Sequence, residues 1–135
     1  MSGPKGRGSR PKSNSATLPE SPPSEAPGYP CLSLRHVQSG YGVEELSPSQ
    51  QAAFLVKWAK RSVFTWKELS AHQRHGLGSE QLSATSIKRS PPEELAQDKY
   101  MALRHEGNHP FVGYKIGDTF YVLWMEADYG DVYDH

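Results

Sequence analysis

A β-hairpin predicted over residues 111–126 constrains the fold of this chain more than any other stretch. Two runs rich in Val, Ile, Phe, Tyr and Trp are separated by Gly117-Asp118, a pair that supplies the positive φ needed in a two-residue turn. The second run, residues 120–125, is apolar at nearly every position, so both of its faces should meet other parts of the protein. We therefore expect this run to be a central strand of a sheet.

A strand and a helix are predicted ahead of the hairpin. Residues 31–37 alternate between apolar and polar side chains, which indicates a first strand. The sequence Ser47-Pro48-Ser49-Gln50 combines an N-cap, a proline at the first helical position and a capping-box glutamine, and it predicts a helix that continues to Arg61. We expect this helix to bury Phe54, Leu55, Trp58 and Ala59 and to turn Lys57, Lys60 and Arg61 toward water or a ligand.

The rest of the chain predicts a second helix and further strands. A second capping box at residues 65–68 starts a short helix that should end near residues 75–76, and strands are expected at 82–89, 100–105 and 131–135. The predicted fold class is α+β, with one strand, two helices and then an antiparallel meander sheet. Residues 30–135 should form a single domain, and the Gly-, Pro- and Ser-rich residues 1–29 a disordered tail.

Composition narrows the classes of function. The formal net charge of +0 argues against indiscriminate nucleic-acid binding, although residues 5–12 are basic enough for weak DNA contact. No apolar run is long enough for a membrane span and no secretory leader is visible, so a cytoplasmic location without membrane contact is expected. The single cysteine, Cys31, has no partner for an internal disulfide.

Side chains suited to cleaving RNA without a metal accumulate in the second half of the chain. They are Arg74, His75, Lys88, Arg89, Arg104, His105, Tyr133 and His135. Such cleavage needs a base for the 2′-hydroxyl, a cation for the developing charge and an acid for the leaving oxygen. The His72-Gln-Arg-His75 pair offers only two metal ligands, so neither a metal nor another cofactor is predicted.

Several short motifs carry a family resemblance. They are Leu34-Arg-His-Val-Gln38, Thr65-Trp66, Arg74-His-Gly-Leu-Gly78 with Glu80, Arg104, Val112-Gly-Tyr114, Phe120, Leu123-Trp124 and Tyr133-Asp-His135. This pattern is similar to that of a group of short bacterial and mobile-element proteins, and the order of elements resembles the RelE/ParE-type toxins of bacterial toxin-antitoxin systems. Many of those toxins cleave messenger RNA on the ribosome.

The resemblance implies roles for particular residues. Arg104 would bind the scissile phosphate, His135 or Tyr133 would act as acid or base, and His75 would join this catalytic set. Arg74, Lys88 and Arg89 would bind RNA along the phosphate path. The implied partners are RNA or the ribosome and a small antitoxin protein. The alternative is a non-enzymatic interaction module of a phage or mobile element, with a contact surface formed by the acidic C-terminal region and by Tyr114, Phe120, Tyr121 and Trp124.

Overall fold

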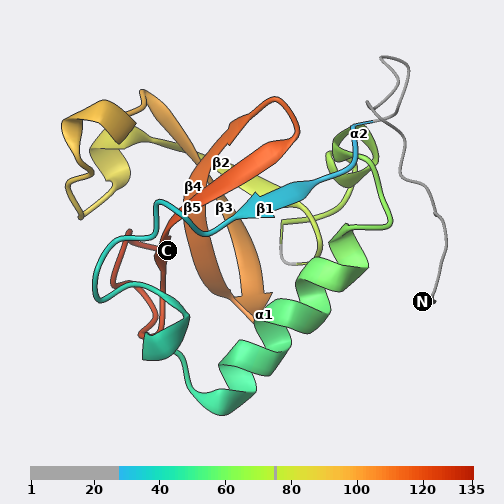
Figure 1. Cartoon of the computed structure of the whole chain (residues 1–135), viewed down its shortest axis with the longest axis horizontal. Coiled ribbons are helices and arrows are strands. Elements are labelled where there is room, and N and C mark those ends of the chain that lie inside the picture. The colour runs from blue at the N-terminus through green and yellow to red at the C-terminus, as the bar shows by residue number, and fades with distance from the viewer. Residues whose placement is uncertain (1–27, 75) are drawn as a thin grey trace, which may run out of the picture.

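The computed structural model describes residues 28–74 and 76–135, which form an α+β fold around one five-stranded mixed sheet (Figure 1). The elements are β1 (Cys31–Ser33), α1 (Pro48–Arg61), α2 (Trp66–Leu69), β2 (Ser79–Ser83), β3 (Lys99–Glu106), β4 (His109–Ile116) and β5 (Thr119–Met125). The strand order across the sheet is β1-β5-β4-β3-β2. The predicted disordered tail lies outside the described residues, apart from Gly28 and Tyr29.

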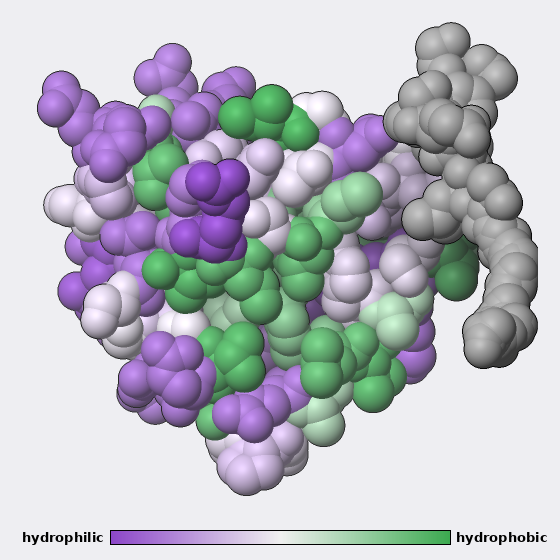
Figure 2. Space-filling view, viewed as in Figure 1, coloured by the Kyte–Doolittle hydropathy of each residue, from purple (hydrophilic) through white to green (hydrophobic). Residues whose placement is uncertain are grey.

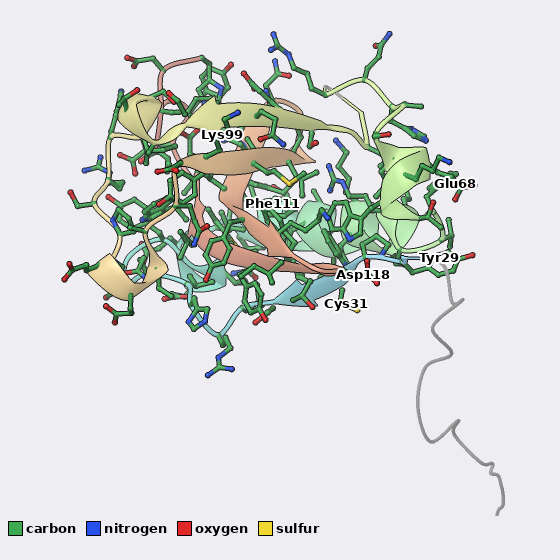
Figure 3. All side chains as sticks on the ribbon, turned by 90° about the horizontal axis from the view of Figure 1, so that it is seen from above. Tyr29, Cys31, Glu68, Lys99, Phe111 and Asp118 are labelled. Carbon is green, nitrogen blue, oxygen red and sulfur yellow. The ribbon has the colours of Figure 1, made fainter. Side chains whose placement is uncertain are left out.

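The predicted hairpin is confirmed. β4 and β5 pair antiparallel, and Gly117 takes a φ of 60° in the turn between them. β5 lies between β1 and β4, so residues 120–125 belong to an internal strand and not to an edge strand, as expected from their apolar sequence. The start of the domain is fixed to this turn, because Asp118 O accepts hydrogen bonds from Cys31 N and from Trp66 Nε1, both at 2.9 Å (Figure 3).

Other predictions of secondary structure are corrected. The strands after the helices, β2 to β5, do form the predicted antiparallel meander, but β1 adds to it by pairing parallel with β5, so the sheet as a whole is mixed. The strand expected at 82–89 occupies Ser79–Ser83 instead, and α2 ends at Leu69, short of residues 75–76. Residues 131–135 add only one isolated bridge, from Tyr133 to Ile87, because much of their backbone binds side chains instead of a sheet ladder.

α1 covers one face of the sheet. Its capping box is present, with the Ser47 side chain accepting from Gln50 N, and Phe54 and Trp58 stack edge-on against Phe111 of β4. The prediction of which side chains of this helix are buried is partly wrong. Leu55 is 66% exposed, whereas Arg61 is completely buried. Both results follow from the helical period, since positions 54, 58 and 61 share the face that meets the sheet.

The opposite face of the sheet is covered by loops and by two short 3-10 helices, Ala84–Ser86 and Glu93–Leu95, and not by an α-helix. The core on this side comprises Leu82, Tyr100, Ala102, Val112, Tyr114, Leu123, Trp124, Val132 and Tyr133. Partly buried Ile87 and Leu95 from the connection between β2 and β3 pack on it. Because side chains of a strand alternate, Glu80 and Arg104 point to this same face.

Gly113 allows β4 and β5 to approach closely at an irregular point of their register. A Cβ at this position would collide with the backbone carbonyl oxygen of Tyr121 and lie 2.8 Å from its carbon. We expect Gly113→Ala to lower the free energy of unfolding by about 3 kcal/mol, because backbone cannot yield as a side chain does. Urea denaturation measures this change.

Gly76→Ala is the matched control, because the nearest atom to its added Cβ is Gln73 O at 3.6 Å. Its effect should stay within about 1 kcal/mol of wild type. Equal stability of the two variants would show that the strands adjust at Gly113.

Candidate functional site

The carboxylate of Glu80 collects three hydrogen-bond donors from distant parts of the chain. Arg74 Nη1 lies 3.3 Å from its Oε2, while Arg104 Nη2 at 3.2 Å and the Tyr133 hydroxyl at 3.3 Å both donate to its Oε1. Three elements position these groups, since Glu80 stands in β2, Arg104 in β3 and Tyr133 in the C-terminal segment. We call these four residues the Glu80 cluster.

Access to the Glu80 cluster is graded from the surface inward. The side chain of Arg74 is 53% exposed and that of Glu80 is 23% exposed, whereas that of Arg104 is only 3% exposed. Arg104 Nε and Nη1 are buried without a hydrogen-bond partner among the described residues. The cluster therefore has an exposed arginine at its mouth and a buried arginine with unused donors at its base.

Arg61 supports the cluster from the other side of the sheet. Its Nη2 donates to the backbone oxygen of Arg104 at 2.8 Å, its Nε donates to Leu77 O at 3.0 Å, and its guanidinium lies 5.5 Å from the Phe111 ring centroid. Burial, together with the nearby charge of Arg104, lowers the pKa of Arg61 to about 10, so it remains a cation at neutral pH. Arg61 thus holds the backbone of Arg104, while Arg74 and Arg104 bind the carboxylate of Glu80.

Glu126 organises the C-terminal segment that delivers Tyr133. Its carboxylate is completely buried and accepts from Gly130 N at 2.9 Å, Val132 N at 2.7 Å and Tyr133 N at 3.3 Å. His135 Nε2 donates to the same carboxylate at 2.9 Å. Four donors on one buried carboxylate fold residues 130–135 back along the sheet.

Tyr133 and His135 lie together, as the sequence suggested. Their ring centroids are 4.2 Å apart, and the His135 side chain is only 7% exposed. Burial raises the pKa of the Tyr133 hydroxyl well above its usual range, so this group stays protonated near neutral pH. Tyr133 and Arg104 therefore donate hydrogen bonds to the same oxygen of Glu80. His135 contacts the Glu80 cluster only by packing against the Tyr133 ring.

The predicted RNA-binding residues are divided between the cluster and the C-terminal segment. Arg74 belongs to the Glu80 cluster. Lys88 Nζ lies 2.8 Å from Asp134 Oδ1, and Arg89 Nη2 lies 2.8 Å from Asp131 Oδ1. These two ion pairs fasten the C-terminal segment. The remaining predicted catalytic residue, His75, lies outside the described residues.

His105 stands on the face of the sheet that α1 covers, away from Glu80. It is completely buried, and its Nε2 donates to Glu126 O at 3.1 Å, which fixes the tautomer because a carbonyl oxygen only accepts. Burial lowers the pKa of His105 to about 4. Its neutral form is therefore part of the core.

This buried histidine predicts a loss of stability in mild acid. In the unfolded chain the imidazole of His105 binds a proton as pH falls below about 6.5, whereas in the folded protein it stays neutral down to about pH 4. The free energy of unfolding should therefore fall by about 3 kcal/mol between these two pH values. Urea titrations at pH 7 and 4.5 should show a loss about 2 kcal/mol larger for wild type than for His105→Gln. The control His36→Gln keeps the buried imidazole and the full loss. Identical pH dependence in wild type and His105→Gln would contradict this assignment.

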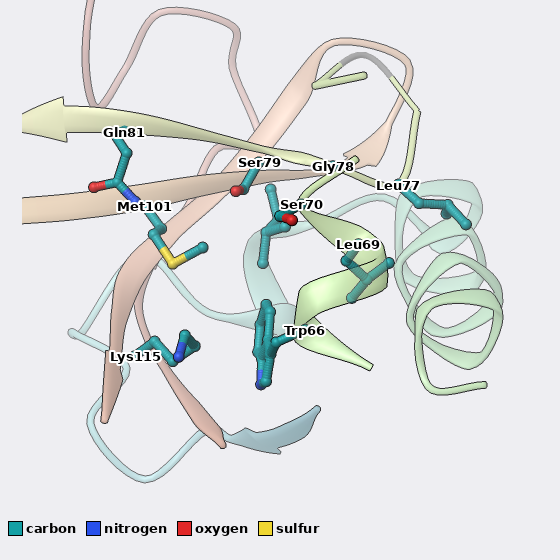
Figure 4. A pocket seen from close by; sticks show the side chains of 10 residues that line it. Trp66, Leu69, Ser70, Leu77, Gly78, Ser79, Gln81, Met101 and Lys115 are labelled. Carbon is teal, nitrogen blue, oxygen red and sulfur yellow. The ribbon is translucent and has the colours of Figure 1, made fainter. Parts of the chain in front are cut away.

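A small pocket lies beside α2, apart from the Glu80 cluster. It has a volume of about 170 Å³, and Trp66, Leu69 and Met101 contribute to its apolar wall (Figure 4). Lys115 at its rim places Nζ 5.4 Å from the centroid of the Trp66 ring. Among the described residues, no group of three or more His, Cys, Asp or Glu side chains is arranged to hold a metal ion.

Three residues that build the Glu80 cluster or hold it in place were not predicted from the sequence. Glu80 was part of a motif without a role, Arg61 was expected to face water or a ligand, and Glu126 was one of several acidic residues near the C-terminus. A carboxylate directly after an apolar central strand is the one local signal that marks Glu126 as buried. Glu80 and Arg61 gain their importance mainly from tertiary contacts, which in both cases include Arg104.

Comparison with known proteins gives no relative. No protein-family model, no curated protein and no solved structure matches the chain. Within residues 28–74 and 76–135, no helix has the length and apolar character needed to cross a membrane.

Proposed function

We propose that this chain is a metal-independent endoribonuclease of the bacterial toxin type that cleaves messenger RNA, with its reacting groups at the Glu80 cluster. One observation carries the proposal. Arg74, Arg104 and Tyr133 converge on a partly exposed carboxylate, which is the combination of base, cations and proton donor that such cleavage needs. The element order of one strand, two helices and further strands agrees with the RelE/ParE resemblance.

Local charge favours binding of a phosphate. Arg74 and Arg104 outnumber the carboxylate of Glu80, and two buried nitrogen atoms of Arg104, Nε and Nη1, have no hydrogen-bond partner among the described residues. Guanidinium groups suit the paired oxygens of a phosphodiester. RNA enters beside the exposed Arg74, and its scissile phosphate takes over donors of Arg74 and Arg104 that now bind Glu80.

Cleavage then follows from proton transfer between named groups. Glu80, released from the arginines, accepts the proton of the 2′-hydroxyl, and the 2′-oxygen forms a bond to phosphorus. Arg104 and Arg74 stabilise the charge that develops on the non-bridging oxygens. The bond from phosphorus to the 5′-oxygen breaks, and the departing oxygen takes the proton of Tyr133. The products are a 2′,3′-cyclic phosphate and a 5′-hydroxyl.

His135 has a positioning role in this scheme. Its ring packs on Tyr133, and its Nε2 bond to Glu126 holds the end of the chain in place. Because its imidazole meets neither Glu80 nor the arginines in the described contacts, the direct proton transfers fall to Glu80 and Tyr133.

The test in cells is induced expression in bacteria with mapping of messenger RNA 5′ ends. Wild type should arrest growth and create new internal 5′ ends, whereas the double variant Glu80→Gln plus Tyr133→Phe should do neither. Both substitutions nearly preserve side-chain size, and circular dichroism of the purified variant checks the fold. Absence of arrest with wild type, or equal arrest with a folded double variant, would refute the proposal.

The aromatic part of the contact surface predicted for the non-enzymatic alternative is buried. Tyr114, Phe120 and Trp124 are buried, with exposed fractions of 7%, 0% and 1%. Tyr121 is half-buried and stacks on Tyr114. Two of the large apolar side chains that are exposed, Leu55 and Val56, lie on α1.

A further inference from the structure

α1 carries a second apolar stripe that faces away from the sheet. Leu55 is 66% exposed and Val56 is 54% exposed, and Val63 just beyond the helix is 68% exposed. Ala52 and Ala59 are also exposed and complete the spacing i, i+3, i+4, i+7 of one helical face. We call these five residues the outer stripe. Apolar side chains gather on the face of the molecule that carries α1 (Figure 2).

Isolated apolar residues on a surface are ordinary, but a continuous stripe on a helix marks a contact surface. The two alanines keep the stripe shallow on either side of Leu55 and Val56 and allow a partner backbone to come close. An apolar helix laid along it would insert its own side chains around Leu55 and Val56, as in helix-in-groove recognition.

The charges beside the outer stripe identify the kind of partner. The exposed Lys60 lies beside Val56 at the edge of the stripe, and α1 has no acidic residue anywhere along residues 48–61. We propose that the outer stripe binds an amphipathic helix of another protein, one whose apolar face is flanked by acidic side chains. Such a helix offers apolar burial to Leu55 and Val56 and opposite charge to Lys60.

A second copy of this chain fits the outer stripe less well. A twofold contact would place Lys60 of both copies at the same interface, and α1 offers no acidic residue to offset this charge. An anionic membrane surface is also disfavoured, because the stripe lacks Trp and Phe and the chain has a net charge of +0.

The proposed docking surface is independent of the RNA-cleaving site. α1 covers the face of the sheet that holds Phe111, whereas the Glu80 cluster lies on the opposite face with Tyr133. A helix on the outer stripe therefore leaves Glu80 uncovered, and it recruits or tethers the protein without blocking the site. Binding can be measured whether or not RNA is cleaved.

The experiment uses the full chain and two synthetic helical peptides. Both carry the same leucine stripe, flanked by glutamates in one peptide and by lysines in the other. Isothermal titration calorimetry should show binding of the acidic peptide and at least tenfold weaker binding of the basic one. The double variant Leu55→Gln plus Val56→Gln should weaken binding of the acidic peptide by about tenfold or more. Ile116→Gln, at a 60% exposed apolar residue elsewhere, should not change it.

Four outcomes would overturn the inference. They are no binding of the acidic peptide, equal binding of both peptides, unchanged binding by the double variant, and a stripe occupied by something else. Occupation by a second copy would appear as a dimer in sedimentation velocity, and occupation by a membrane as flotation with phosphatidylglycerol vesicles. In either case Leu55→Gln plus Val56→Gln would remove the signal.

Discussion

Glu126→Gln should lower the free energy of unfolding by about 3 to 5 kcal/mol, the typical cost of breaking a buried charge network. The carboxylate is 0% exposed and accepts from three backbone N–H groups and from His135. A glutamine has one acceptor oxygen and one NH₂ group, so at least one donor would face another donor. Residues 130–135 should then detach from the sheet.

Two measurements check this result. Urea denaturation gives the change in stability, and hydrogen exchange shows whether protection is lost at Val132 and Tyr133 in particular. Asp128→Asn is the matched control, since Asp128 is exposed, and its effect should stay within about 0.5 kcal/mol. If Glu126→Gln were as stable as this control, the C-terminal segment would be held by Lys88 and Arg89 instead.

Glu80→Gln should reduce the rate of RNA cleavage by about 10²- to 10⁴-fold, the usual contribution of a general base. The amide keeps the shape of the side chain and can still accept from Arg104, but it cannot take the 2′-hydroxyl proton. Glu80 is 23% exposed, so the loss of charge should change stability far less than Glu126→Gln does. Single-turnover cleavage of a labelled RNA in the presence of EDTA measures the rate.

Glu94→Gln is the control for this experiment. It makes the same chemical change at an exposed glutamate in the connection between β2 and β3, and it should cleave at the wild-type rate. A Glu80→Gln variant as fast as Glu94→Gln would remove Glu80 from the base role while leaving the arginines as phosphate ligands.

The parts of the fold that sequence predicts well depend on local signals. The Gly117-Asp118 turn and the Ser47 capping box each act within a few residues, and both elements appear where expected. β1 pairs with a strand far away along the chain, so its parallel direction has no local signature. The faces of α1 were misassigned because the helix has apolar residues on two sides, and only packing decides which side meets the sheet.

The sequence predicted which residues form the candidate site better than it predicted how they are arranged. Arg104, Tyr133 and Arg74 were recognised by residue type and do share one carboxylate. Lys88 and Arg89 were recognised in the same way, yet they bind the C-terminal segment. The type of a residue determines which interactions its side chain can make, and the tertiary structure determines which partner it binds.

The most direct test of the central claim compares two leaving groups in an RNA with one scissile linkage. A bridging 5′-sulfur leaves without a proton, whereas the natural 5′-oxygen needs an acid. We predict that Tyr133→Phe is slow on the oxygen linkage and recovers to near the wild-type rate on sulfur, whereas Glu80→Gln is slow on both. The account is contradicted if wild type leaves the oxygen linkage intact, or if both variants cleave both linkages at the wild-type rate.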